Sequence, residues 1–311
     1  MKTAAYLRTG FLIIAAGASA LLLFSFLDAS QHQKFTKEPT EAFKKYWYNG
    51  KAELTSYKLT QARYGELREG TAVLMFVKID ADKTRLTKLG QGQTSGIPTL
   101  QMNFEKKFVT GIYPYSMELS VLTPIDADQD PRTLKAGASC QEWCGHTYTQ
   151  LNLNGNHYEM TRHSYFPDEA DEKYSLGSEL LEDEIWTRIR TAPDQLPVGK
   201  FKMIQGLFYS RLAHNKPAIF EVEATHGDCP GNPKLKEYKV TFPTFNRTLI
   251  IRYEKEFPYV IDNWEETYTD GFGEKAKQLT TKGEKMKTIV VDYWSKNSVA
   301  DSTWRKELGL Q

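Results

Sequence analysis

Short hydrophobic runs alternate with polar positions along most of the chain, and turn-forming residues separate them. The clearest run, residues 71–79, is apolar over almost its full length and ends at Asp80. Runs of this length that are rich in β-branched and aromatic residues predict strands. The expected strands cover residues 52–61, 71–79, 104–109, 117–122, 143–153, 157–166, 200–209, 218–224, 237–242, 248–253, 260–269 and 288–293.

Two other segments show features of helices. A short helix is predicted over residues 41–48, directly after Thr40. A longer amphipathic helix is predicted over residues 178–190, with Ser178 as its N-cap and the acidic residues 182–184 near the positive end of its dipole. Three apolar residues at i, i+4 spacing predict its buried face: Leu181, Ile185 and Ile189.

Many short strands with few helices predict a mainly antiparallel β fold, that is, a β-rich α+β class. Similar aromatic-Pro-Tyr segments at residues 113–115 and 257–259 suggest two related half-sheets, which would form a sandwich or an open barrel. The halves of this β-rich domain (residues 40–311) would be 40–175 and 195–311. The alternative is that the similarity arises by chance in a chain rich in aromatic residues.

The N-terminal region predicts export. Residues 11–27 carry no charge and follow the basic residues Lys2 and Arg8. Residues 1–30 are therefore expected to be a signal peptide or an N-terminal membrane anchor, followed by a polar linker over residues 31–39. Both alternatives stay open, because the apolar run is slightly shorter than a bilayer core but longer than the apolar segment of most signal peptides. If it is uncleaved, residues 11–27 would bind the inner membrane, with the rest on the periplasmic side.

Composition excludes several classes of function. The net charge is +1, with 40 basic and 39 acidic residues, so there is no electrostatic basis for binding nucleic acid. The chain has no phosphate-binding glycine loop, no nucleophile elbow and no zinc-protease motif, and we expect no cofactor. Three cysteines, Cys140, Cys144 and Cys229, allow one disulfide at most, so the core must stabilise the fold.

The most specific local signal is a predicted hairpin between residues 143–153 and 157–166. Asn154-Gly155 is a strong two-residue turn signal. With that turn, His146 would lie opposite His163, and period-2 alternation would place both on one face with Cys144 and Glu159.

Cys144, His146, Glu159 and His163 are therefore the candidate site, and three hypotheses apply to it. The first is a polar, solvent-facing strand pair without chemistry. The second is a metal site formed by His146, His163 and Cys144, because imidazole and thiolate bind zinc or copper. The third is a hydrolase in which Cys144 is the nucleophile and one histidine is the base. A disulfide between Cys140 and Cys144 would remove that nucleophile. No residue is assigned as catalytic.

Several segments resemble a known group of proteins. They are WYNGKAELTSYKLTQARYGELREGTAVLMFV (47–77), FVTGIYPYSMELSVLTP (108–124), QEWCGH (141–146), FPYVIDNWEETY (257–268) and YWSKNS (293–298). In these segments the chain resembles functionally uncharacterised Gram-negative envelope proteins that are frequently labelled "septum formation inhibitor Maf". Many of those proteins are exported or lipidated, whereas this sequence lacks the lipobox cysteine.

The Maf label itself implies a cytosolic nucleotide pyrophosphatase with a Ser-x-Ser-Pro-Arg-Arg motif and an alternating βαβ pattern. Neither feature is present in this sequence. The resemblance therefore implies a place in the cell envelope but transfers no catalytic residue, and a pyrophosphatase is the least supported hypothesis. We expect a non-enzymatic envelope protein that binds a partner protein or an apolar ligand on the periplasmic side. The alternative is a Cys/His hydrolase or metal-binding protein centred on the hairpin.

Overall fold

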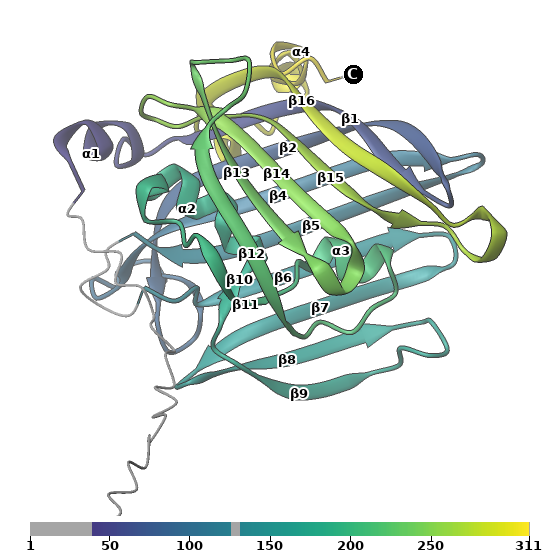
Figure 1. Cartoon of the computed structure of the whole chain (residues 1–311). Coiled ribbons are helices and arrows are strands. Elements are labelled where there is room, and N and C mark those ends of the chain that lie inside the picture. Colours follow the sequence, from purple (N-terminus) through teal and green to yellow (C-terminus); the bar gives the residue numbers. More distant parts are fainter. Residues whose placement is uncertain (1–38, 126–130, 311) are drawn as a thin grey trace, which may run out of the picture. The chain divides into compact units, whose positions relative to one another are not determined.

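The computed structural model describes residues 39–125 and 131–310 (Figure 1). The predicted signal or anchor over residues 1–30 lies outside the described residues, as does the linker up to residue 38. None of the helices in the described part combines the length and hydrophobicity needed to cross a bilayer.

The predicted fold class is confirmed. The described chain is mostly β structure, and its strands join into one large sheet in which all neighbours are antiparallel except β10 and β11. The first half of the sheet comprises β1 (Ala52–Arg63), β2 (Glu66–Asp82), β3 (Thr87–Lys88), β4 (Ile97–Thr110), β5 (Tyr113–Pro124), β6 (Lys135–Glu142), β7 (Gly145–Asn154), β8 (His157–Ser164) and β9 (Glu172–Gly177). The second comprises β10 (Leu180–Leu181), β11 (Gly199–Ile204), β12 (Ile219–Asp228), β13 (Leu235–Phe242), β14 (Arg247–Glu254), β15 (Ile261–Asp270) and β16 (Lys277–Val291).

The two predicted half-sheets are continuous parts of one sheet rather than two separate sheets. The last strand, β16, pairs with β1 along Ala52 to Thr60, so the beginning and the end of the domain meet in the middle of the sheet. The strands β9 and β10 form its two edges and do not pair with each other, so the sheet stays open. In Figure 1 the β12–β15 layer lies in front of the β2–β5 layer.

Helices are short and few in the described part. They are α1 (Glu41–Trp47), α2 (Ile185–Thr191), α3 (Leu207–Leu212) and α4 (Thr303–Glu307). Single 3₁₀ turns are η1 (Glu182–Glu184), η2 (Pro193–Gln195), η3 (Pro243–Phe245), η4 (Gly273–Lys275), η5 (Tyr293–Ser295) and η6 (Val299–Ser302). The prediction of α1 is confirmed, and the Thr40 hydroxyl accepts a hydrogen bond of 3.2 Å from the Phe43 N–H as its N-cap.

The helix predicted over residues 178–190 begins later than expected. Leu180 and Leu181 pair with β11 as the short strand β10, a 3₁₀ turn follows, and α2 starts only at Ile185. Ser178 does not cap it. The physical reason is tertiary: the acidic residues 182–184 are buried, and the first two bind partners far away in the sequence rather than the helix dipole. The predicted face is correct, because Leu181, Ile185 and Ile189 are all buried.

The strand predicted over residues 200–209 is half wrong. Only Gly199–Ile204 is a strand, and the chain then forms the helix α3. All six residues of α3 are buried, so the segment lacks the polar face that makes a helix recognisable in a sequence. The strand predicted from residue 143 also starts later, at Gly145.

Both halves of the sheet share one hydrophobic core, and α2 lies between them. Trp186 of α2 makes edge-to-face contacts with Phe104 of β4 and Trp264 of β15, with ring centroids 5.2 and 5.6 Å apart. The Trp264 ring requires a glycine on the neighbouring strand, because a Cβ atom at Gly283 would lie 2.1 Å from it. This contact fixes the identity of Gly283 through packing.

An ion pair anchors the same helix to the first half. Arg190 of α2 and Glu53 of β1 are both 1% exposed and form two hydrogen bonds of 2.5 and 2.6 Å. The Tyr46 hydroxyl donates to the same carboxylate, and the Arg190 Nε–H donates to the Pro258 carbonyl. Because each charge is paired, the cost of burying it is offset. The arginine thus joins α2 to α1, to β1 and to the loop before β15.

Candidate functional site

The hairpin that carries the predicted site forms, but with a different register. Asn154 pairs with His157, so the two turn residues are Gly155 and Asn156 rather than Asn154 and Gly155. Gly155 takes a φ of +56°, which a glycine adopts without strain at the first position of such a turn. His163 therefore lies opposite Tyr148, and the predicted pairing of His146 with His163 is wrong.

A shift of two residues leaves every side chain on its predicted face. His146, Glu159 and His163 are exposed, whereas Leu151, Tyr158 and Met160 on the other face are buried in the core. The outward, polar face of the hairpin is therefore present as predicted.

His146 and His163 both line a groove of about 420 Å³ on this outer face, over β6, β7 and β8. The His163 Nδ1 atom lies 3.1 Å from Asp171 Oδ2, and the His146 ring lies 6.5 Å from the ring of Tyr165. Glu159 is not among the groove residues. It accepts a hydrogen bond of 2.7 Å from the Asn154 side chain at the turn.

Cys144 lies in the turn between β6 and β7 and is exposed. Its N–H donates a hydrogen bond of 2.7 Å to Glu142 Oε2, and the same carboxylate raises the pKa of the Cys144 thiol. A nucleophilic cysteine needs the opposite shift, since only the thiolate reacts. All three cysteines are free thiols in the structure.

The structure does not gather a set of metal ligands at the hairpin. Across residues 39–125 and 131–310, no group of three or more histidine, cysteine, aspartate or glutamate side chains is placed to hold a metal ion. His146 and His163 share the groove, but Cys144 and Glu159 lie outside its lining.

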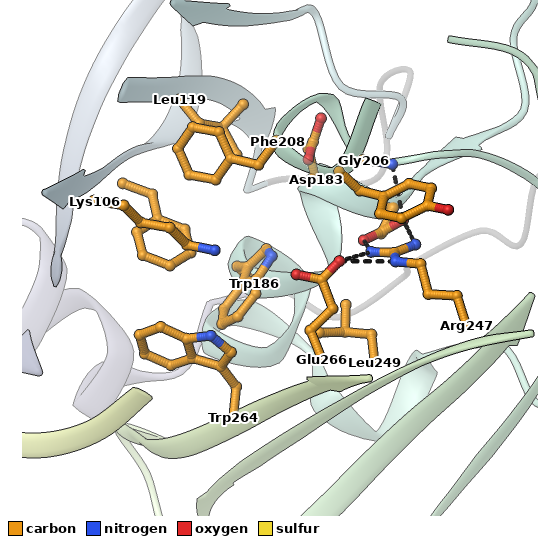
Figure 2. Close-up of a pocket in the computed structure, with 13 residues that line it drawn as sticks. Lys106, Leu119, Asp183, Trp186, Gly206, Phe208, Arg247, Leu249, Trp264 and Glu266 are labelled. Carbon is orange, nitrogen blue, oxygen red and sulfur yellow. Dashed lines mark hydrogen bonds and ion pairs between the residues drawn. The ribbon is translucent and has the colours of Figure 1, made fainter. Parts of the chain in front are cut away.

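A second cluster of charged residues, which the sequence analysis did not single out, lies inside the fold (Figure 2). Arg247 of β14 donates two hydrogen bonds to Glu182 and one of 2.8 Å to Glu266 of β15. Glu182 also accepts from the Gly206 N–H, and Asp183 accepts from the Leu207 N–H. Glu182 and Asp183, which were predicted to interact with a helix dipole, therefore bind the start of α3, and Glu182 also binds β14.

Lys106 of β4 points into the same cavity and is 3% exposed (Figure 2). It contacts the rings of Phe104 and Phe208, each 5.1 Å from its Nζ atom, and has no hydrogen-bond partner among the described residues. Burial lowers the pKa of Lys106, whereas burial and the neighbouring Glu182 raise the pKa of Asp183 to about 8. The cavity measures about 20 Å³, which is room for a single water molecule.

The alternation of Phe104, Lys106 and Phe108 is a signal that could have placed Lys106 inside. These residues share one face of β4, and the two phenylalanines are buried. Other residues that line the cavity come from α3, β14 and β15, and no local pattern in the sequence connects these elements with β4.

The β1–β2, β4–β5, β6–β7 and β15–β16 turns meet at one end of the sheet (Figure 1). They carry aromatic side chains that are exposed (Trp143, Phe272) or half-buried (Tyr64, Tyr113). Tyr113 stacks on Trp143 with centroids 6.2 Å apart, and its hydroxyl donates a hydrogen bond of 3.0 Å to the Tyr64 hydroxyl. The Tyr64 ring lies 6.4 Å from that of Phe272. We call this set, with the exposed Ile112, the aromatic end: Tyr64, Ile112, Tyr113, Trp143 and Phe272.

Three of the segments that carry the resemblance to Maf-labelled envelope proteins, residues 47–77, 108–124 and 141–146, contain turns of the aromatic end. The structure therefore brings these separate segments to one place. Comparisons of the chain with protein-family models, with curated proteins and with solved structures find no match.

Proposed function

We propose that this protein is a non-enzymatic component of the cell envelope that binds a partner protein on the periplasmic side through its aromatic end. The observation that carries the proposal is a cluster of apolar side chains at four turns, in which Ile112, Trp143 and Phe272 are exposed and Tyr64 and Tyr113 are half-buried. Trp143 is 69% exposed, Phe272 61% and Ile112 79%. Large apolar side chains gathered at the surface are typical of protein interfaces, in which tryptophan and tyrosine supply most of the binding energy.

The small size of the interior cavity favours a binding site on the surface over one inside the fold. The cavity beside Lys106 holds about one water molecule, and aromatic side chains from both halves fill the core around α2. An apolar ligand therefore finds no room in that cavity. For this reason we carry forward the partner protein and not the apolar ligand.

The hydrolase alternative gains no support from the hairpin, because the Glu142 carboxylate raises the pKa of the Cys144 thiol and so disfavours the reactive thiolate. A pyrophosphatase gains none either, because the sequence lacks the motif of that class. The periplasmic location rests on the N-terminal sequence pattern and on the resemblance.

Site-specific photo-crosslinking in the producing bacterium tests the proposal. With p-benzoylphenylalanine in place of Trp143 or Phe272, we expect a discrete crosslinked species that also forms at Ile112. The control position is Val299 in η6, which is apolar and 93% exposed but lies away from the aromatic end. The absence of a crosslink at all three positions, or an equal crosslink at Val299, would contradict the proposal.

A further inference from the structure

The groove on the outer face of β6–β8 differs in chemistry from the aromatic end. We propose that it is a second binding site, which takes a neutral saccharide unit of an envelope glycan. This inference goes beyond the partner protein proposed above and rests on different residues. The groove is formed by exposed rings, by uncharged hydrogen-bonding groups and by one histidine–aspartate pair.

Two tyrosines lie against glycine positions of the sheet. A Cβ atom at Gly145 would lie 2.7 Å from Tyr165 Cβ and 3.3 Å from its Cγ, so the base of the Tyr165 side chain requires a glycine at position 145. The Tyr148 hydroxyl lies 3.5 Å from the corresponding position at Gly137. Tyr165 is 79% exposed and lines the groove, so its ring is accessible to a ligand there. Sugar rings bind such surfaces through their C–H groups, because an aromatic ring is apolar and carries partial negative charge on its face.

Hydrogen-bonding groups surround these rings. Ser139 and Gln141 come from β6 and His146 from β7. His163 comes from β8, and Asp171 directly precedes β9. The 3.1 Å contact between His163 and Asp171 orients the imidazole, and the other oxygen atom of the carboxylate stays available. Sugar hydroxyl groups donate and accept at neighbouring positions, and amide, hydroxyl, imidazole and carboxylate groups match them.

The charge of the groove selects a neutral ligand. Neither lysine nor arginine lines it, and Asp171 is its only carboxylate. A phosphate or a uronic acid would meet this carboxylate without a permanent cation to balance the charge. The volume of about 420 Å³ lies within the range of roughly 300–1,000 Å³ that is typical of small-molecule sites.

The test uses the full-length chain and defined sugars. We expect saturation transfer and a measurable binding isotherm with the neutral trimers of N-acetylglucosamine or glucose, and none with the trimer of galacturonic acid. Binding of neither neutral trimer, or equal binding of the acidic trimer, would overturn the proposal.

Substitutions of the groove tyrosines test whether the saccharide binds in the groove. Tyr165→Ala and Tyr148→Ala should each weaken the affinity by about tenfold or more, a loss typical of one removed aromatic contact. Tyr165→Phe keeps the ring and should bind within about twofold of the wild type. The matched control is Tyr48→Ala, since Tyr48 is 42% exposed, as Tyr148 is, but lies at the end of α1. Circular dichroism and the thermal midpoint confirm that each variant is folded.

The outcomes separate the two proposals. Saccharide binding that survives both alanine variants would overturn the groove as the site. A protein crosslinked at Tyr165 without saccharide binding would assign the groove to a protein partner and also overturn it. Neither result changes the crosslinks expected at Trp143 and Phe272, so the glycan and the partner protein can fail independently.

Discussion

Among single residues, Asp183 couples the stability of the fold to pH. Burial and the neighbouring Glu182 raise its pKa to about 8, from an ordinary value near 3.8. The folded protein therefore holds this proton more tightly than the unfolded chain does. Its contribution to stability is fully present below about pH 4 and is lost as the pH rises to about 8.

We expect the free energy of unfolding to fall with rising pH over this range, by up to about 1.4 kcal/mol per pH unit from this group alone. Asp183→Asn should flatten the dependence, because an amide stays neutral and its oxygen can still accept from the Leu207 N–H. Urea unfolding at pH 5, 7 and 9 measures the slope. The exposed Asp228→Asn is the control and should leave it unchanged. An equal slope in Asp183→Asn and wild type would contradict the assignment.

The two buried cations of the interior cluster should respond in opposite ways. Arg247 pairs with Glu182 and Glu266, so Arg247→Met leaves two buried carboxylates without their partner and should cost about 3–5 kcal/mol. Lys106 is buried without a hydrogen-bond partner among the described residues, so Lys106→Met should leave stability unchanged or increase it. Urea midpoints compare the two. A loss in Lys106→Met as large as in Arg247→Met would show that Lys106 is needed to balance Glu266.

At the level of elements, packing of α2 between the two halves of the sheet stabilises the core. Its Ile185 is fully buried, so Ile185→Ala should cost about 2–4 kcal/mol through the cavity that it leaves. Ile112→Ala is the matched control, since Ile112 is 79% exposed and its loss should be within about 0.5 kcal/mol. Thermal or urea unfolding measures both. Similar losses in the two variants would mean that α2 is not packed between the halves.

The elements also show what local pattern can predict. Alternation and turn residues predicted most strands, the helix α1 and the outward face of the hairpin, because these depend on neighbours in the sequence. They did not predict where α2 starts, since Glu182 and Asp183 bind Arg247, Gly206 and Leu207. They missed α3 because its residues are all buried. The hairpin register failed for a local reason, since Gly155 occupies the first turn position rather than the second.

In the whole molecule, the pairing of β16 with β1 joins the last strand of the domain to the first, and both halves of the sheet share one core. Trp186 and Arg190 of α2 contact the two halves at once. The proposed site at the aromatic end depends on this tertiary arrangement and not on a sequence motif. The aromatic end joins turns from residues 64 to 272, and no sequence pattern indicates that they meet.

A shared core predicts cooperative unfolding. Far-UV circular dichroism reports the whole sheet, and the fluorescence of the buried Trp47, Trp186 and Trp264 reports tertiary packing in the shared core. We expect one transition with coincident midpoints by the two probes in urea. Two separate transitions would show that residues 40–175 and 195–311 behave as independent halves.

The central claim is that the aromatic end binds a partner while the interior serves stability. The most direct measurement is the native size of the protein in gently solubilised envelopes of the producing cells. We predict that the wild type migrates in a complex larger than the free chain, and that a Trp143→Ala, Phe272→Ala variant with an unchanged thermal midpoint migrates as the free chain. A wild type that migrates alone, or a variant that stays in the complex, would contradict the account.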